Sequence, residues 1–197
     1  MRRFLVLLCF FFPPLAGAQY PNKPVKIIVP FAPGGASDFV ARILQPRMGE
    51  LLGQQIVIEN RPGASGNISM EAAERSDPVG YTVYLGNIGT IAINTGVFPN
   101  LRVDPVKDFI SITRVVDLPG VLVAHSAFPP DTFKEFFDYV KANPGKMNYA
   151  QPGSGSQNRL EMENLRKTAG GMQMVHVPYK GGAGPAVAAL AAGETQG

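Results

Sequence analysis

Two consecutive glycines, Gly34 and Gly35, separate an apolar run at residues 27–29 from a segment whose apolar residues have helical spacing. Because glycine has no Cβ atom, a ligand can approach the backbone closely at these positions. Ser37 or Asp38 is a suitable N-cap, and the free N–H groups at the start of a helix attract anions. No lysine belongs to this junction, so it suits a carboxylate better than a triphosphate.

Three other loops carry residues that suit binding of a small polar ligand. Asn87 and Thr90 follow an apolar run, where they could bind a ligand or simply close a turn. The glycine–serine loop at residues 151–156 offers hydroxyl and backbone N–H groups. Lys180 is the one cation of a glycine-rich loop, and it either binds a carboxylate as a point charge or is a solvated surface residue. Tyr179 beside it is expected to be half buried.

The elements that must position these loops alternate between strand and helix, the pattern of an α/β fold with a largely parallel sheet. In the first half we expect three strands and two helices. The strands are residues 27–29, 55–59 and 81–85, and the helices follow at about 37–51 and 65–76. Each strand ends in a loop rich in Gly, Asn, Ser or Thr. Parallel strands end at one edge of the sheet, which is where ligands bind in open α/β sheets.

The second half repeats this logic without repeating the sequence. Strands are expected at 110–116, 120–124, 147–150 and 174–177, and helices at 131–142, 160–169 and 185–192. We therefore predict two α/β domains, residues 19–108 and residues 109–197, whose facing loops form a cleft.

The N-terminus has the features of a cleavable signal peptide spanning residues 1–18. A basic start, Arg2–Arg3, precedes an apolar run that is too short to span a bilayer, and Ala16–Ala18 is a cleavage signature. The mature chain should begin near Gln19, in the periplasm and without a membrane anchor. Cys9 lies inside the apolar run, which disfavours its lipidation.

Composition excludes several classes of function. Without the two leader arginines the chain has 16 basic and 15 acidic residues, so no nucleic-acid partner is indicated. Cys9 is the only cysteine, and His125 and His176 lie 51 positions apart without a ligand-like spacing, so we expect no metal and no cofactor. No nucleophile elbow, P-loop, GxGxxG or HExxH motif is present, which argues against an enzyme.

Several motifs occur in the order found in one known family. They are Pro30–Gly35 with Asp38 and Arg42, Glu59–Asn67, Asp77–Thr82, Gly153–Ser156 and Val177–Gly181. The chain thereby resembles the Bug-type substrate-binding proteins of tripartite tricarboxylate transporters, the TctC family. Each motif is weak alone, but together they extend over nearly the whole mature chain.

The resemblance implies a two-domain periplasmic binding protein of the type II, or Venus-flytrap, kind. Such a protein captures a small carboxylate and delivers it to a membrane permease of the tripartite tricarboxylate type. It implies contacts to the ligand from four loops, whose candidate residues here are Pro33, Gly34, Gly35, Ala36, Ser37, Asn87, Thr90, Ser154, Gly155, Ser156, Tyr179, Lys180 and Gly181.

The sequence also departs from the family pattern. Arg159 stands where the family usually has histidine, and either a carboxylate contact or a surface charge would explain it. Family chains are considerably longer, so we expect the fold to be incomplete at its C-terminus and ligand binding by this chain to be weak. A sensor that presents the bound carboxylate to a membrane signalling protein, or a fragment without function, are the alternatives.

Overall fold

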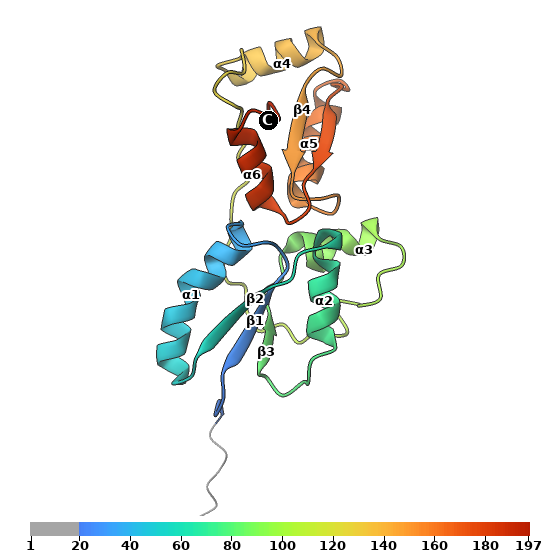
Figure 1. Ribbon diagram of the computed structural model, residues 1–197. Coiled ribbons are helices and arrows are strands. Elements are labelled where there is room, and N and C mark those ends of the chain that lie inside the picture. The colour runs from blue at the N-terminus through green and yellow to red at the C-terminus, as the bar shows by residue number, and fades with distance from the viewer. Residues whose placement is uncertain (1–19) are drawn as a thin grey trace, which may run out of the picture.

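The computed structural model describes residues 20–197, which form two lobes (Figure 1). The predicted signal peptide lies outside the described residues. The first lobe contains β1 (Val25–Val29), α1 (Ala36–Leu52), β2 (Ile56–Asn60), η1 (Ala64–Gly66), α2 (Asn67–Glu74), β3 (Thr82–Tyr84), η2 (Gly89–Ile93) and α3 (Asn94–Val97). The second lobe contains α4 (Phe133–Ala142), β4 (Asn148–Gln151), α5 (Gln157–Thr168), β5 (Val175–Pro178) and α6 (Ala183–Ala191). No helix within residues 20–197 has the length and apolar character needed to cross a membrane.

The first lobe is built on a parallel sheet of three strands in the order β2-β1-β3. Ile27 on β1 lies opposite Ile58 on one side and Val83 on the other. Four of the five residues of β1 are buried, as is usual for the central strand of a parallel sheet covered on both faces. Helix α1 lies on one side of this sheet and α2 on the other (Figure 1). The three predicted strands of the first half are confirmed.

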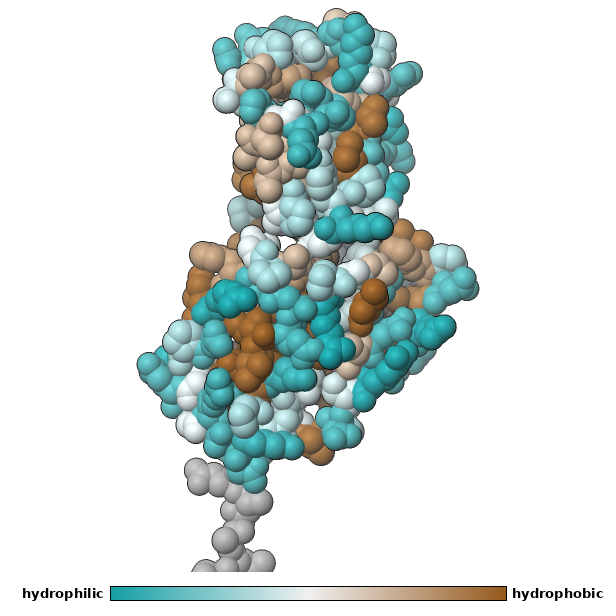
Figure 2. Space-filling model, viewed as in Figure 1, coloured by the Kyte–Doolittle hydropathy of each residue, from teal (hydrophilic) through white to brown (hydrophobic). Residues whose placement is uncertain are grey.

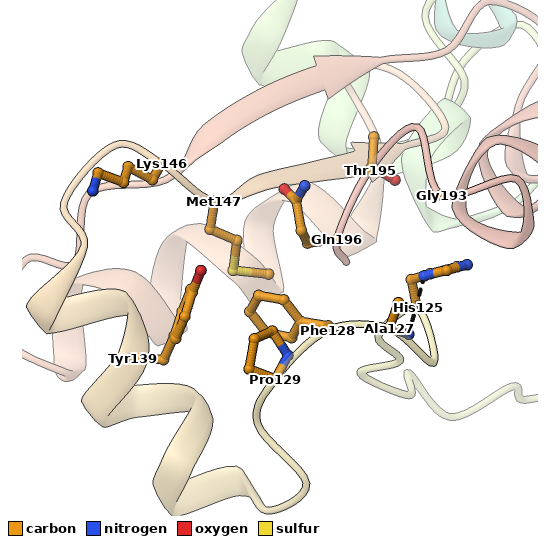
Figure 3. A pocket seen from close by; sticks show the side chains of 10 residues that line it. All are labelled: His125, Ala127, Phe128, Pro129, Tyr139, Lys146, Met147, Gly193, Thr195 and Gln196. Atoms are coloured by element: carbon orange, nitrogen blue, oxygen red, sulfur yellow. Dashed lines mark hydrogen bonds between the residues drawn. The ribbon is translucent and has the colours of Figure 1, made fainter.

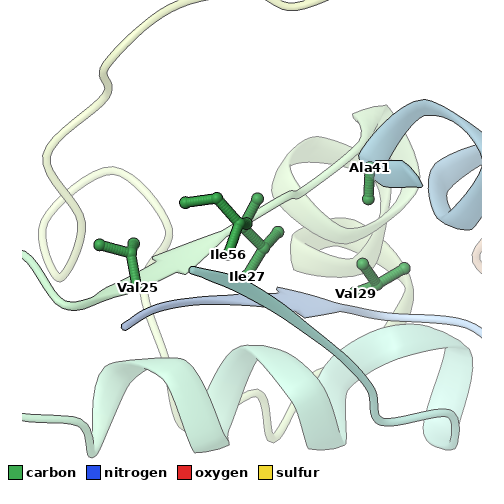
Figure 4. Packing of buried hydrophobic residues seen from close by; sticks show 5 residues of the cluster. All are labelled: Val25, Ile27, Val29, Ala41 and Ile56. Atoms are coloured by element: carbon green, nitrogen blue, oxygen red, sulfur yellow. The ribbon is translucent and has the colours of Figure 1, made fainter. Parts of the chain in front are cut away.

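The core of the first lobe joins β1, β2 and α1 through Val25, Ile27, Val29, Ala41 and Ile56 (Figure 4). Met48 and Leu52 of α1 pack against this cluster. The apolar residues with helical spacing in α1 do not all face the core, because Ile43 and Leu51 are 60% and 69% exposed. Apolar residues are correspondingly visible on the surface of this lobe (Figure 2).

The start of α1 also differs from the prediction. Gly35 occupies the N-cap position with an extended backbone, and no side chain caps the helix. Ser37 and Asp38 lie inside the first turn instead, and Asp38 bonds backward to the preceding loop. At the other end Gly53 adopts a left-handed conformation (φ 63°) and terminates the helix, the usual role of glycine at this position.

The second lobe has a parallel pair, β4 and β5, with Tyr149 opposite His176. Helix α4 begins with a complete capping box: Thr132 accepts a hydrogen bond from the Glu135 N–H, and the Glu135 carboxylate accepts one from the Thr132 N–H. A second core cluster gathers around α4 and the start of β4; its members are Phe128, Phe136, Val140, Met147 and Met172. The predicted helices and the two later strands of this half are confirmed within a few residues.

The predicted strands at 110–116 and 120–124 are wrong. Residues 109–125 form neither strand nor helix, although their side chains are rich in Val and Ile. Strand propensity only becomes a strand when a neighbouring strand accepts the backbone hydrogen bonds, and residues 20–197 provide none here.

Candidate functional site

The loops that follow β1 and β5 meet directly between the two lobes. The Ala32 N–H donates to the Gly181 carbonyl at 2.7 Å. A Cβ atom added at Gly35 would lie 3.8 Å from the Gly184 nitrogen, and one at Gly184 would lie 3.3 Å from the Pro33 carbonyl oxygen. The glycines predicted to allow close approach of a ligand therefore also allow close approach of the two backbones.

A second meeting point involves the glycine–serine loop after β4. Gly155 is buried, and its N–H donates to the Ser65 hydroxyl at 3.4 Å. A side chain at Gly155 would overlap Asn94 Oδ1 and contact Phe98, so only glycine fits. From the first lobe Gly89 also approaches, since a Cβ atom there would lie 2.9 Å from the Gly155 carbonyl oxygen.

Asn94 is fully buried at this contact and only half satisfied. Its Nδ2 group donates to the Ser65 carbonyl at 3.0 Å and to Asn67 Oδ1 at 2.6 Å. Its Oδ1 atom has no hydrogen-bond partner among the described residues. A buried acceptor without a partner is costly, and Gly155 covers Asn94 Oδ1, so this atom is an unsatisfied group inside the contact between the lobes.

The buried Asp38 carboxylate fixes the Gly34–Gly35 loop through hydrogen bonds. It is 2% exposed, and its carboxylate accepts hydrogen bonds from Arg42 Nε at 2.9 Å, the Gly34 N–H at 3.0 Å and Asn60 Nδ2 at 3.0 Å. The Arg42 hydrogen bond lowers the pKa of this carboxyl group from its ordinary value; Gly34 and Asn60 add to the effect and burial opposes it. Because the Asp38 carboxylate lies in the first turn and already accepts the N–H of Gly34, just before the N-cap, the start of α1 is less open to an anion than the sequence suggested.

Asn87 and Thr90 are bonded to each other. The Thr90 N–H donates to Asn87 Oδ1 at 3.0 Å, and the Asn87 N–H donates to Thr90 Oγ1 at 3.1 Å. Thr90 is completely buried. The pair closes the turn that leads from β3 into η2, which was the alternative interpretation of these two residues.

The serines after β4 organise the start of α5. Ser156 is the N-cap and accepts from the Arg159 N–H at 3.3 Å, while the Arg159 guanidinium donates to the Ser154 carbonyl at 3.1 Å. Arg159 thus places a positive charge beside this loop. Burial, with Arg159 as a further cause, lowers the pKa of His176 on the neighbouring strand. The helix start and the guanidinium together favour an anion at the loop.

The two polar residues of the loop after β5, Tyr179 and Lys180, have different surroundings. The Tyr179 hydroxyl donates to the Glu194 carboxylate at 3.3 Å, at the far end of α6. Lys180 is exposed. Of the predicted residues, Pro33, Gly34 and Gly35 lie against Gly184, which was not predicted, whereas Gly181 contacts Ala32. Gly155 lies against a second part of the first lobe. The sequence analysis did not predict Ser65 and Asn94 as site residues. The glycines on both sides of Ser65, in the sequence Gly-Ala-Ser-Gly, were the signal of a tight loop there.

A cavity of about 350 Å³ lies elsewhere, in the second lobe (Figure 3). It is lined by His125, Ala127, Phe128, Pro129, Tyr139, Lys146, Met147, Gly193, Thr195 and Gln196, none of which is a predicted site residue. Within residues 20–197, no group of three or more His, Cys, Asp or Glu side chains could hold a metal ion.

Comparison with known proteins decides the family. Residues 40–197 match the model of the tripartite tricarboxylate transporter family receptor. The chain belongs to this receptor family. Curated relatives are 26–37% identical to it, and the chain spans about half of their length.

Solved structures of binding proteins share the fold of this family member. The periplasmic binding protein BugD is 35% identical, with a TM-score of 0.84. Two proteins of Rhodopseudomonas palustris are also similar: MatC with bound malate (34% identity, TM-score 0.82) and Rpa4515 with adipate (30% identity, TM-score 0.87). Each comparison covers 90% of this chain but only 58–60% of the other. The α/β periplasmic-binding-protein fold expected from the resemblance is confirmed.

Proposed function

We propose that this protein binds a small dicarboxylate between its two lobes in the periplasm and delivers it to a permease of the tripartite tricarboxylate type. Family membership supports a solute-binding role. MatC and Rpa4515, described with malate and with adipate, suggest dicarboxylates as the ligand class. The export predicted from residues 1–18 and the division into domains 19–108 and 109–197 belong to the same proposal.

The observation that carries this proposal is the convergence of glycine-rich loops from both lobes. The Ala32 nitrogen lies 2.7 Å from the Gly181 carbonyl oxygen, and Gly155 packs against Ser65 and Asn94. Glycine-rich loops can approach a small ligand closely from two sides, and lobe closure then excludes water.

We assign one carboxylate of the ligand to the loop at 154–156. This loop starts α5, whose N–H groups favour an anion, and Arg159 adds a full positive charge. The other end of the ligand faces the Gly34–Gly35 loop, where a Cβ atom at Gly34 would have no atom within 4 Å and the backbone is open to close approach.

Ligand-observed NMR with malate and adipate, on the chain beginning at Gln19, tests the proposal and detects weak binding. Gly35→Val should reduce the affinity at least tenfold, because its γ carbons would fill the space toward Ala183 and Gly184. Gly96→Val is the matched control, since Gly96 has open space around it and lies outside the converging loops. Equal affinity of the Gly35→Val variant would show that the site is elsewhere. Failure of both acids to bind the unmodified chain would contradict the proposed ligand class.

A further inference from the structure

Two residues of η1, Ala64 and Ser65, have left-handed backbone conformations although neither is glycine. Their φ angles are 46° and 55°, and within residues 20–197 only glycines otherwise have a positive φ. A side chain in this conformation costs conformational energy and persists where the surroundings hold it, which is common at ligand clamps and active sites. Such strain points to a contribution from a side chain that glycine could not make.

Buried amide side chains of the first lobe hold Ser65 in this conformation. The Asn94 Nδ2 group donates to the Ser65 carbonyl at 3.0 Å and to Asn67 Oδ1 at 2.6 Å. Asn94 is fully buried and Asn67 is 7% exposed. The backbone of Ser65 is thereby anchored to the interior of the first lobe, while the residue itself is half buried.

The Ser65 hydroxyl lies against the glycine–serine loop of the second lobe. It accepts a hydrogen bond from the Gly155 N–H at 3.4 Å, and a Cβ atom at Gly153 would lie 2.9 Å from it. Ala64, by contrast, is exposed. Of the two strained residues, Ser65 therefore supplies the side chain that reaches from one lobe to the other.

This hydroxyl still has a hydrogen bond to donate. A serine hydroxyl donates one hydrogen bond and can accept two. Gly155 uses it as an acceptor, and among residues 20–197 no group accepts its proton. Gly155 directly precedes Ser156, the N-cap of α5, and the Arg159 guanidinium bonds to the same loop. The donor is thus placed beside the positively charged loop of the second lobe.

We propose that the Ser65 hydroxyl donates a hydrogen bond to the carboxylate at the glycine–serine loop and so connects the ligand to the first lobe. The inference rests on the proposed function, which assigns one carboxylate of the ligand to residues 154–156. The bound ligand completes a chain in which the Gly155 N–H donates to Ser65 and Ser65 donates to the carboxylate. Hydrogen bonds in such a chain strengthen one another, and the last one is charge-assisted. An anionic ligand therefore tightens the contact between the lobes through Ser65.

Two glycine substitutions in the strained pair test the proposal. Glycine adopts the left-handed conformation without strain, so Ser65→Gly and Ala64→Gly should both retain the fold, as measured by circular dichroism. Ser65→Gly removes the hydroxyl, whereas Ala64→Gly is the matched control. In ligand-observed NMR with malate and adipate, on the chain beginning at Gln19, Ser65→Gly should weaken binding by about tenfold or more, the effect of losing a hydrogen bond to a charged group. Ala64→Gly should change the affinity by less than about twofold.

The amide proton of Gly155 provides a second readout that a structural role of Ser65 would not change. When Ser65 donates to the ligand, its oxygen becomes a better acceptor, so malate should shift the Gly155 amide proton downfield in the unmodified chain. Ala64→Gly should keep this shift and Ser65→Gly should abolish it. Equal affinities of the two variants, or a Gly155 amide proton that malate does not shift, would overturn this inference alone. Failure of both acids to bind the unmodified chain would contradict the proposed function and this inference with it.

Discussion

Gly155→Ala should force apart the contact between the glycine–serine loop and the first lobe. The added Cβ atom would overlap Asn94 Oδ1 and lie 3.0 Å from Asn94 Cγ and 3.3 Å from Phe98 Cε2. Asn94 cannot rotate away without losing its hydrogen bonds to the Ser65 carbonyl and to Asn67 Oδ1. Two buried hydrogen bonds at about 0.5–1.5 kcal/mol each, or a comparable cost of overpacking, put the destabilisation of the contact at about 2 kcal/mol.

Native-state amide exchange measures this change directly. A cost of about 2 kcal/mol corresponds to opening that is about 30-fold more frequent. Exchange should accelerate by that factor at residues 89–94 and 153–156 and stay unchanged in β1. The control is Gly96→Ala, where no atom lies within 4 Å of the added methyl group. In a chain that already carries Asn94→Ala, adding Gly155→Ala should cause little further acceleration, because the clash partner and its two hydrogen bonds are already absent. If Gly155→Ala exchanges like Gly96→Ala, the close packing of the lobes inferred here is wrong.

Two substitutions test the supports of the candidate site and of the second lobe. Asp38→Asn should lower the free energy of unfolding by about 1–3 kcal/mol at pH 7, since it removes a buried, charge-assisted network. Because Arg42 holds the pKa of Asp38 below the ordinary 3.8, this stabilisation is complete above that pH and is lost as the pH falls through the folded-state pKa; urea titrations whose difference between variants grows toward acid pH would contradict it. Thr132→Ala should cost about 1 kcal/mol by removing the cap of α4, and in urea denaturation Thr132→Ser should retain most of that stability.

The fold class and the order of the elements were predictable from the sequence because they depend on local patterns. The buried run around Ile27 has the unbroken apolar character of a central parallel strand. The cap at Thr132 and the glycine loops after the strands depend only on neighbouring residues. Parallel strands that end in glycine-rich loops must place those loops at one edge, so the general location of the candidate site followed as well.

Tertiary structure alone decided which of these residues touch. Asp38 was expected to cap α1, but Asn60, 22 residues away, and Arg42 make it a buried brace of the glycine loop. No sequence pattern marked Asn94 as part of the candidate site, because its role comes from packing against Gly155 of the other lobe. Residues 110–124 have a strong preference for strand, yet residues 20–197 offer them no strand partner. Propensity and periodicity describe what one segment favours, whereas hydrogen-bond partners from distant segments determine whether it is realised.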